Sequence, residues 1–95
     1  MSGRPDVSVI IPYHNREKYI DEAVQSVLAQ TLQPREIIIV NDCSSESSRR
    51  YLDRYQNCCK IVDLPVNVGL AGSRNAGIDA AAISKTVRTA LGGSG

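Results

Sequence analysis

The chain has 95 residues, of which 42% are hydrophobic and 22% charged, and its net charge is +1. This composition is typical of a globular chain with one domain at most, and it excludes collagen-like, mucin-like and charge-rich disordered proteins. The near-neutral charge provides no broad basic surface, so we expect no nucleic-acid partner.

No apolar run approaches the ~20 residues that span a bilayer, so we expect no transmembrane segment. The first six residues lack the hydrophobic segment of a signal peptide, which indicates a cytoplasmic protein. Cys43, Cys58 and Cys59 form no CxxC spacing, and we interpret them as reduced thiols. A zinc site that uses His14 as fourth ligand is the less favoured alternative.

The first strand is predicted at Val7–Ile11, a β-branched apolar run that Pro12 closes. A helix follows from Glu17, with Asn15 as the expected N-cap, and it stops before Pro34. Its apolar stripe recurs at four-residue steps through Tyr19, Ala23 and Val27 and through Ile20, Val24 and Leu28.

A second buried strand is predicted at Glu36–Val40, followed by a polar loop and a short helix that Ser44 or Ser45 caps. A weaker third strand, Lys60–Leu64, ends at Pro65.

The last predicted helix, Leu70–Ala82, contains Gly72 and Gly77. Each glycine weakens a helix by about 1 kcal/mol relative to alanine. Their presence indicates a close approach of the helix backbone, either to the sheet or to a ligand.

Strands alternating with helices predict an α/β fold with a parallel sheet and right-handed crossovers. Ligands bind such sheets beyond the carboxyl ends of the strands. In this chain those ends are polar or contain glycine: Pro12–Asn15, Asn41–Ser44 and Asn67–Gly69.

These residues could together bind a nucleotide. Tyr13 could supply a flat surface for the base, Asp42 an acceptor for a base N–H or a ribose hydroxyl, and Arg74 with the nearby helix N-terminus a phosphate site. Each residue also has a purely structural alternative. Tyr13 could be a half-buried loop residue, Asp42 a strand-end loop residue or helix cap, and Arg74 a solvated surface charge. His14 is either a polar loop residue or a catalytic base. Neither GxGxxG nor GxxxxGK[ST] occurs.

Four blocks in this order resemble the opening of a family 2 glycosyltransferase: Val7–Asn15, Ile20–Thr31, Glu36–Ser44 and Asn67–Gly77. The resemblance implies a GT-A fold, a Rossmann-like three-layer arrangement with strand order 3-2-1, and sugar transfer from a nucleotide-sugar donor. That donor is commonly a UDP-sugar, used with Mg²⁺ or Mn²⁺. The nucleotide-binding positions implied are Pro12, Tyr13, Asn15, Glu17, Asp42, Gly69 and Arg74.

Two departures from the family matter. The loop that often reads Asp-Asp-Gly-Ser is Asn41-Asp42-Cys43-Ser44 here, and no acidic residue follows Asp79 where the family has a metal-binding Asp-x-Asp. We therefore expect residues 1–82 to be a truncated nucleotide-sugar-binding subdomain without catalytic or metal-binding residues, inactive alone. Residues 83–95 would be an unassigned helix or tail with a Gly/Ser linker. The alternative function is a small nucleotide-binding or self-assembling module without catalysis.

The family resemblance also predicts an exposed sheet edge. In that fold a fourth strand lies beside the first, and its expected absence would leave Val7–Ile11 unpaired. Two outcomes are expected: either Ile83–Leu91 folds back, as a helix, over the sheet, or two chains pair antiparallel through the first strand. The sequence favours the homodimer, because this segment is short.

Overall fold

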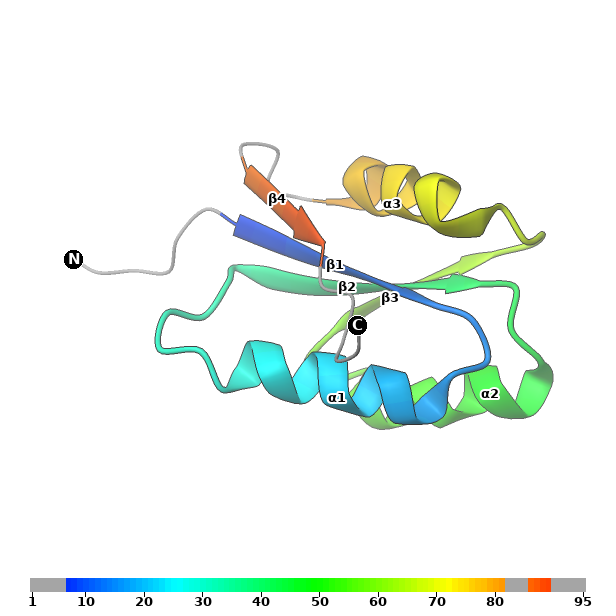
Figure 1. Cartoon of the computed structure of the whole chain (residues 1–95), viewed down its shortest axis with the longest axis horizontal. Coiled ribbons are helices and arrows are strands. Elements are labelled where there is room, and N and C mark those ends of the chain that lie inside the picture. Colours follow the sequence, from blue (N-terminus) through cyan, green and yellow to red (C-terminus); the bar gives the residue numbers. More distant parts are fainter. Residues whose placement is uncertain (1–6, 82–85, 90–95) are drawn as a thin grey trace.

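The computed structural model describes residues 7–81 and 86–89, which form a parallel sheet between helices (Figure 1). The sheet order is β3-β2-β1-β4, and α1 and α2 lie on one face with α3 on the other (Figure 1). The predicted three-layer α/β arrangement with the order 3-2-1 is therefore confirmed. The elements in chain order are β1 (Val7–Tyr13), α1 (Glu17–Leu28), β2 (Glu36–Asp42), α2 (Glu46–Tyr51), the 3-10 helix η1 (Leu52–Tyr55), β3 (Lys60–Leu64), α3 (Gly69–Ala80) and β4 (Thr86–Thr89).

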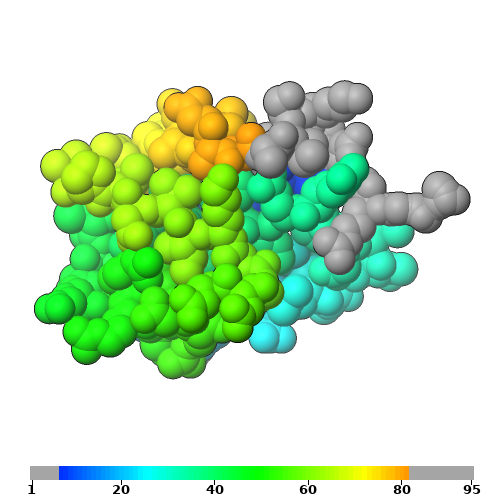
Figure 2. All heavy atoms as spheres, turned by 180° about the vertical axis from the view of Figure 1, so that it is seen from behind, coloured from blue at the N-terminus to red at the C-terminus, as the bar shows by residue number. Residues whose placement is uncertain are grey.

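The two central strands, β1 and β2, are buried on both faces, which explains their uninterrupted apolar sequences. Ile10, Ile38 and Val40 form a small core with Ala76 on the side of α3. The larger core, on the side of α1 and η1, contains Val9, Ile11, Tyr13, Ile20, Ala23, Val24, Val27, Ile37, Ile39, Leu52, Tyr55 and Cys59. Seen from behind, the segment from α2 through β3 forms the green surface below α3 (Figure 2).

The predicted close approach of the α3 backbone to the sheet is confirmed at Gly77 but not at Gly72. A Cβ placed on Gly77 would lie 2.6 Å from Cγ2 of Ile10, so at this position the close approach is to the sheet. A Cβ on Gly72 would lie 2.7 Å from the Val68 side chain, within the segment that leads into the same helix.

The helix starts differ in part from the prediction. Ser45 caps α2 by accepting the Ser48 amide at 3.3 Å, which confirms one of the two expected caps. Asn15 does not cap α1: the residue before this helix is Arg16, which makes no capping hydrogen bond through its side chain. Within the described part of the chain, no helix has the length and apolar character needed to cross a membrane.

The edge of β1 is covered. Strand β4 pairs with it in parallel, with Val7 opposite Thr86 and Ile10 opposite Thr89. The expected exposed edge at β1 is therefore wrong over Val7–Ile10, and antiparallel dimerisation through that edge loses its basis.

The expected helix over 83–91 is wrong at 86–89 and lies outside the described residues elsewhere. The helix prediction rested on the four-residue spacing of Ile83, Val87 and Leu91. Thr86, Val87 and Thr89 are β-branched residues that favour strands. The unpaired backbone groups of β1 also gain hydrogen-bond partners from a fourth strand.

Candidate functional site

A pocket of about 420 Å³ lies at the carboxyl edge of the sheet. Its wall is formed by the end of β1 and the loop after it, the first turn of α1, the end of β2, and the start of α3 with the loop before it, as expected for a parallel sheet. The lining residues are Pro12, Tyr13, His14, Arg16, Tyr19, Asp42, Asn67, Gly69, Leu70 and Ser73. Four of the predicted site residues therefore lie together: Pro12, Tyr13, Asp42 and Gly69.

Asp42 joins the end of β2 to the start of α3. Its Oδ1 accepts the Val68 amide at 2.7 Å and its Oδ2 accepts the Gly69 amide at 3.0 Å. Only 5% of the residue is exposed. The capping role that the sequence left open is thus present in the structure. A carboxylate oxygen can accept more than one hydrogen bond, so this role leaves acceptor capacity at the pocket wall.

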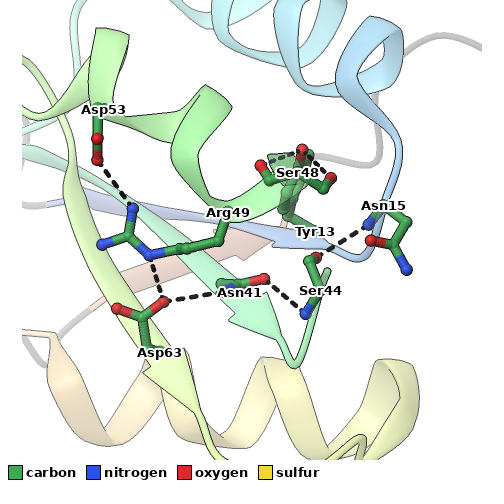
Figure 3. Close-up of polar contacts among 8 residues, drawn as sticks. All are labelled: Tyr13, Asn15, Asn41, Ser44, Ser48, Arg49, Asp53 and Asp63. Atoms are coloured by element: carbon green, nitrogen blue, oxygen red, sulfur yellow. Dashed lines mark hydrogen bonds and ion pairs between the residues drawn. The ribbon is translucent and has the colours of Figure 1, made fainter. Parts of the chain in front are cut away.

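The loop after Asp42 adopts the backbone that glycine favours. Cys43 has φ of 57°, in the left-handed region, at the position where the resembled family often has glycine. Asn41 stabilises the turn, because its Oδ1 accepts the Ser44 amide at 3.1 Å (Figure 3). The loop thus adopts a backbone that glycine favours although it has no glycine, and Cys43 carries the backbone strain of a positive φ.

Tyr13 is part of the core as well as of the pocket wall. It is 1% exposed, and its hydroxyl donates to the Ser48 carbonyl oxygen at 2.9 Å and lies 2.6 Å from Ser48 Oγ (Figure 3). Burial raises the pKa of Tyr13 above its ordinary value. The ring has no free face for stacking, so the expected flat surface for a base is not supplied by this residue.

Two rings with more exposed surface line the pocket instead: His14 is exposed and Tyr19 is half-buried. The Arg16 guanidinium lies 5.4 Å from the centroid of the Tyr19 ring, within the range of a cation–π contact. His14 Nδ1 donates to the Asp42 carbonyl oxygen at 2.7 Å, so this histidine ties two loops together.

Three predicted site residues do not line the pocket: Asn15, Glu17 and Arg74. Asn15 links two loops, since its amide donates to Ser44 Oγ at 2.9 Å (Figure 3) and its Oδ1 accepts the Ser45 amide at 2.7 Å. Glu17 is half-buried at the start of α1, and Arg74 is exposed on α3.

Arg16, Tyr19, Leu70 and Ser73 line the pocket although nothing in the sequence analysis placed them there. Asn67 was expected at this edge of the sheet, but without a role of its own. The four-residue spacing places Tyr19 in the core stripe of α1, and Ser73 carries no signal beyond its place next to Arg74. Arg16 could have been found from its position directly after the first strand-end loop.

A polar network supports the pocket from the side of β3. Asp63 accepts from Arg49 Nε at 2.6 Å and from Asn41 Nδ2 at 2.9 Å, and Arg49 also contacts Asp53 at 3.1 Å (Figure 3). Burial raises the pKa of Asp63, but the hydrogen bonds from Arg49 and Asn41 and the charge of Arg49 together lower it below its ordinary value. The network therefore fixes the ends of β2 and β3 relative to each other and to α2.

Acid is expected to remove the stability that this network contributes. Because folding lowers the pKa of Asp63, its contribution is present above the unfolded pKa of about 3.9 and is lost as the pH falls through the lower folded value. Half of the side chain is exposed, so we expect about 1 kcal/mol at most. Urea unfolding should show that the parent exceeds Asp63→Asn in stability near pH 7 and converges with it near pH 2. A constant difference across this range would contradict the assignment.

The chain is similar in sequence to known glycosyltransferases. The model of the family described as "Glycosyl transferase family 2" matches residues 8–82. A Bacillus subtilis glycosyltransferase, TuaG, whose name links it to teichuronic acid biosynthesis, is 40% identical over 81 residues, which are 82% of this chain and 32% of that protein. Glycosyltransferase GlyG of Streptococcus pneumoniae is 35% identical over 78 residues, 79% of this chain and 26% of that protein.

Solved structures show the same fold. Staphylococcus aureus TarS bound to UDP-GlcNAc superposes with a TM-score of 0.71 at 29% identity, over 87% of this chain and 26% of that one. The mannosyltransferase PcManGT of Pyrobaculum calidifontis, in complex with GDP-Man and Mn²⁺, has a TM-score of 0.71 at 22% identity, over 84% and 25% of the two chains. The chain thus spans about a third or less of the length of these relatives.

Proposed function

The chain belongs to glycosyltransferase family 2, and from this premise we propose that it binds the nucleotide part of a nucleotide-sugar donor, with UDP-sugars as the donor class. The single observation that carries this proposal is the buried carboxylate of Asp42 in a pocket at the carboxyl edge of the sheet. Support comes from TarS, which has been solved with UDP and with UDP-GlcNAc.

The chemistry of Asp42 favours uracil. An ionised carboxylate only accepts hydrogen bonds, and the uracil ring carries an imide N–H between two carbonyl groups. Cytosine has an unprotonated ring nitrogen in that position, so it would place an acceptor against Asp42. We therefore propose that Asp42 receives the imide N–H and disfavours cytosine.

Arg16 is the proposed partner of the diphosphate. It is exposed and lines the pocket, and arginine matches the geometry of phosphate oxygens. This assignment replaces the expected role of Arg74, which is exposed but outside the pocket wall.

Glycosyl transfer by the whole enzyme also needs a group that neutralises the leaving diphosphate and a base that deprotonates the acceptor hydroxyl. Two structural neighbours have been solved with Mn²⁺. The described residues do not fit such an ion, because Asp42 is the only carboxylate among the residues that line the pocket. Across 7–81 and 86–89, no three His, Cys, Asp or Glu side chains come together as a metal site.

We therefore propose that residues 1–82 are a donor-binding unit that does not transfer sugar on its own. Residues 83–95 would then be an accessory segment, of which Thr86–Thr89 joins the sheet. The three free cysteines are compatible with a reducing compartment and with the proposed cytoplasmic location.

Calorimetric titration with UDP and CDP tests the proposed nucleotide site. We expect UDP to bind, CDP to bind at least about tenfold more weakly because of repulsion at Asp42, and the UDP affinity to be the same in EDTA and in excess Mn²⁺. Absence of UDP binding would contradict the function, and equal CDP affinity would contradict the role of Asp42. A strong Mn²⁺ dependence would contradict our assessment of the metal ligands.

Two arginine variants provide a matched pair for the same titration. Arg16→Ala should weaken UDP binding roughly fivefold, as expected for one exposed charge–phosphate contact of ~1 kcal/mol. Arg74→Ala removes the same side chain from outside the pocket and should leave the affinity unchanged. The reverse pattern would restore Arg74 as the phosphate ligand.

A further inference from the structure

Ser73 lines the pocket and has a buried hydroxyl without a hydrogen-bond partner in the described part of the chain, and the proposed nucleotide site so far gives it no role. It lies in the second turn of α3, lines the pocket and is 1% exposed. Among the buried side-chain nitrogen and oxygen atoms of the described residues, its Oγ is the one that lacks a hydrogen-bond partner.

A buried hydroxyl without a partner destabilises a protein, because it has given up its hydrogen bonds to water. Alanine would fit the same space without that loss and would favour the helix more strongly. The other buried hydroxyls illustrate the usual outcome: Ser8 Oγ donates to Glu36 at 2.7 Å, and Ser48 Oγ pairs with the Tyr13 hydroxyl. Ser73 differs from them because its hydroxyl has no partner among the described residues, and it lies in the pocket wall, where a ligand could supply the missing hydrogen bond.

We propose that the Ser73 hydroxyl is a specificity-determining group that hydrogen-bonds the nucleobase. This inference rests on the proposed nucleotide binding. A serine side chain has one torsion between staggered positions, so Oγ can turn toward the pocket without movement of the helix. A hydroxyl can donate to a base carbonyl oxygen while the carboxylate of Asp42 accepts the neighbouring N–H.

The burial of the wall favours the base over the diphosphate as the partner of Ser73. Ser73, Tyr13 and Asp42 are each at most 5% exposed, whereas Arg16 and Asn67 are exposed. A neutral ring tolerates the buried part of the pocket, while the charged diphosphate needs solvent and the Arg16 cation. Ser73 thus lies in the part of the wall suited to the base.

The decisive variant is Ser73→Ala, measured for binding and for stability. We expect its UDP affinity to fall about three- to tenfold, because one hydrogen bond to the ligand is lost. Binding of inorganic pyrophosphate, which has no base, should not change. The melting temperature of the free protein should stay the same or rise, since an unpaired buried hydroxyl has been removed.

Ser8→Ala is the matched control, because Ser8 is also a buried serine but lies outside the pocket. It should lower the melting temperature and leave the UDP affinity unchanged. Unchanged UDP affinity in Ser73→Ala, an equal loss of pyrophosphate binding, or a melting temperature lowered as in Ser8→Ala would overturn the inference on Ser73 alone. Absence of UDP binding in the parent would overturn the proposed function together with it.

Discussion

Replacing Gly77 by valine is expected to leave most of the chain unfolded under conditions in which the parent chain is folded. A Cβ at this position would lie 2.6 Å from Cγ2 and 2.9 Å from Cδ1 of Ile10. Ile10 is fully buried in the central strand β1, so neither the helix nor the strand can move without disturbing the sheet. Gly77→Ala alone should cost about 1–3 kcal/mol through overpacking, and the two extra methyl groups of valine should cost more. Urea unfolding followed by circular dichroism measures both.

Two controls separate crowding from backbone effects. Gly69 has φ of 80°, and a Cβ added there would meet no atom within 4 Å, so Gly69→Ala should cost about 1–2 kcal/mol by strain alone. Combining Gly77→Ala with Ile10→Ala removes the clashing side chain, so the double variant should lose less stability than the two single changes added together. Parent-like stability of Gly77→Ala would show that α3 does not press on β1.

The core of the fold could be predicted from the sequence because local signals and the global arrangement agree. Val7–Ile11 and Glu36–Val40 are too short and too β-branched for helices, and the alternation with helical segments requires parallel crossovers. Thr86–Thr89 shows where this reasoning ends. Its β-branched residues favour a strand, whereas the four-residue spacing of Ile83, Val87 and Leu91 favours a helix. Pairing with the edge of β1 decides between the two, and local spacing does not reveal this long-range effect.

The candidate site was only partly predictable, for a similar reason. The sequence identifies which loops meet at the carboxyl edge, because the topology fixes that. It does not show which side chains face the pocket: Tyr13 points into the core toward Ser48, while Tyr19, one of the apolar positions of α1, reaches the pocket wall. Likewise, asparagine is a residue type that often caps helices, but Asn15 joins two loops and does not cap α1.

Asp42→Ala is expected to damage the fold and the nucleotide site together. The change removes both acceptors of the Val68 and Gly69 amides, which should cost about 2–4 kcal/mol, since two amides lose a charged partner. The start of α3 carries part of the pocket wall, so UDP affinity should fall by more than about tenfold, the equivalent of 1.4 kcal/mol. Urea unfolding and calorimetric titration measure the two effects separately.

Asp42→Asn tests the same carboxylate without removing its volume. One carboxamide oxygen can still accept an amide, so the loss of stability should be smaller than in Asp42→Ala, about 1–3 kcal/mol. The new N–H₂ group can donate a hydrogen bond to the ring nitrogen of cytosine, whereas the carboxylate of Asp42 can only accept one. The preference for UDP over CDP should therefore shrink or reverse in this variant.

Asp63→Asn is the matched control for that ratio, because it makes the same chemical change at the end of the neighbouring strand but outside the pocket wall. It should weaken the contact with Arg49 and leave the UDP-to-CDP ratio as in the parent. If Asp42→Asn lost stability but kept the parental ratio, Asp42 would be a structural cap without contact to the base. If Asp63→Asn changed the ratio as strongly as Asp42→Asn, the discrimination would come from the net charge of this edge. A change confined to Asp42→Asn is the result expected of a carboxylate that both fixes the start of α3 and contacts the base.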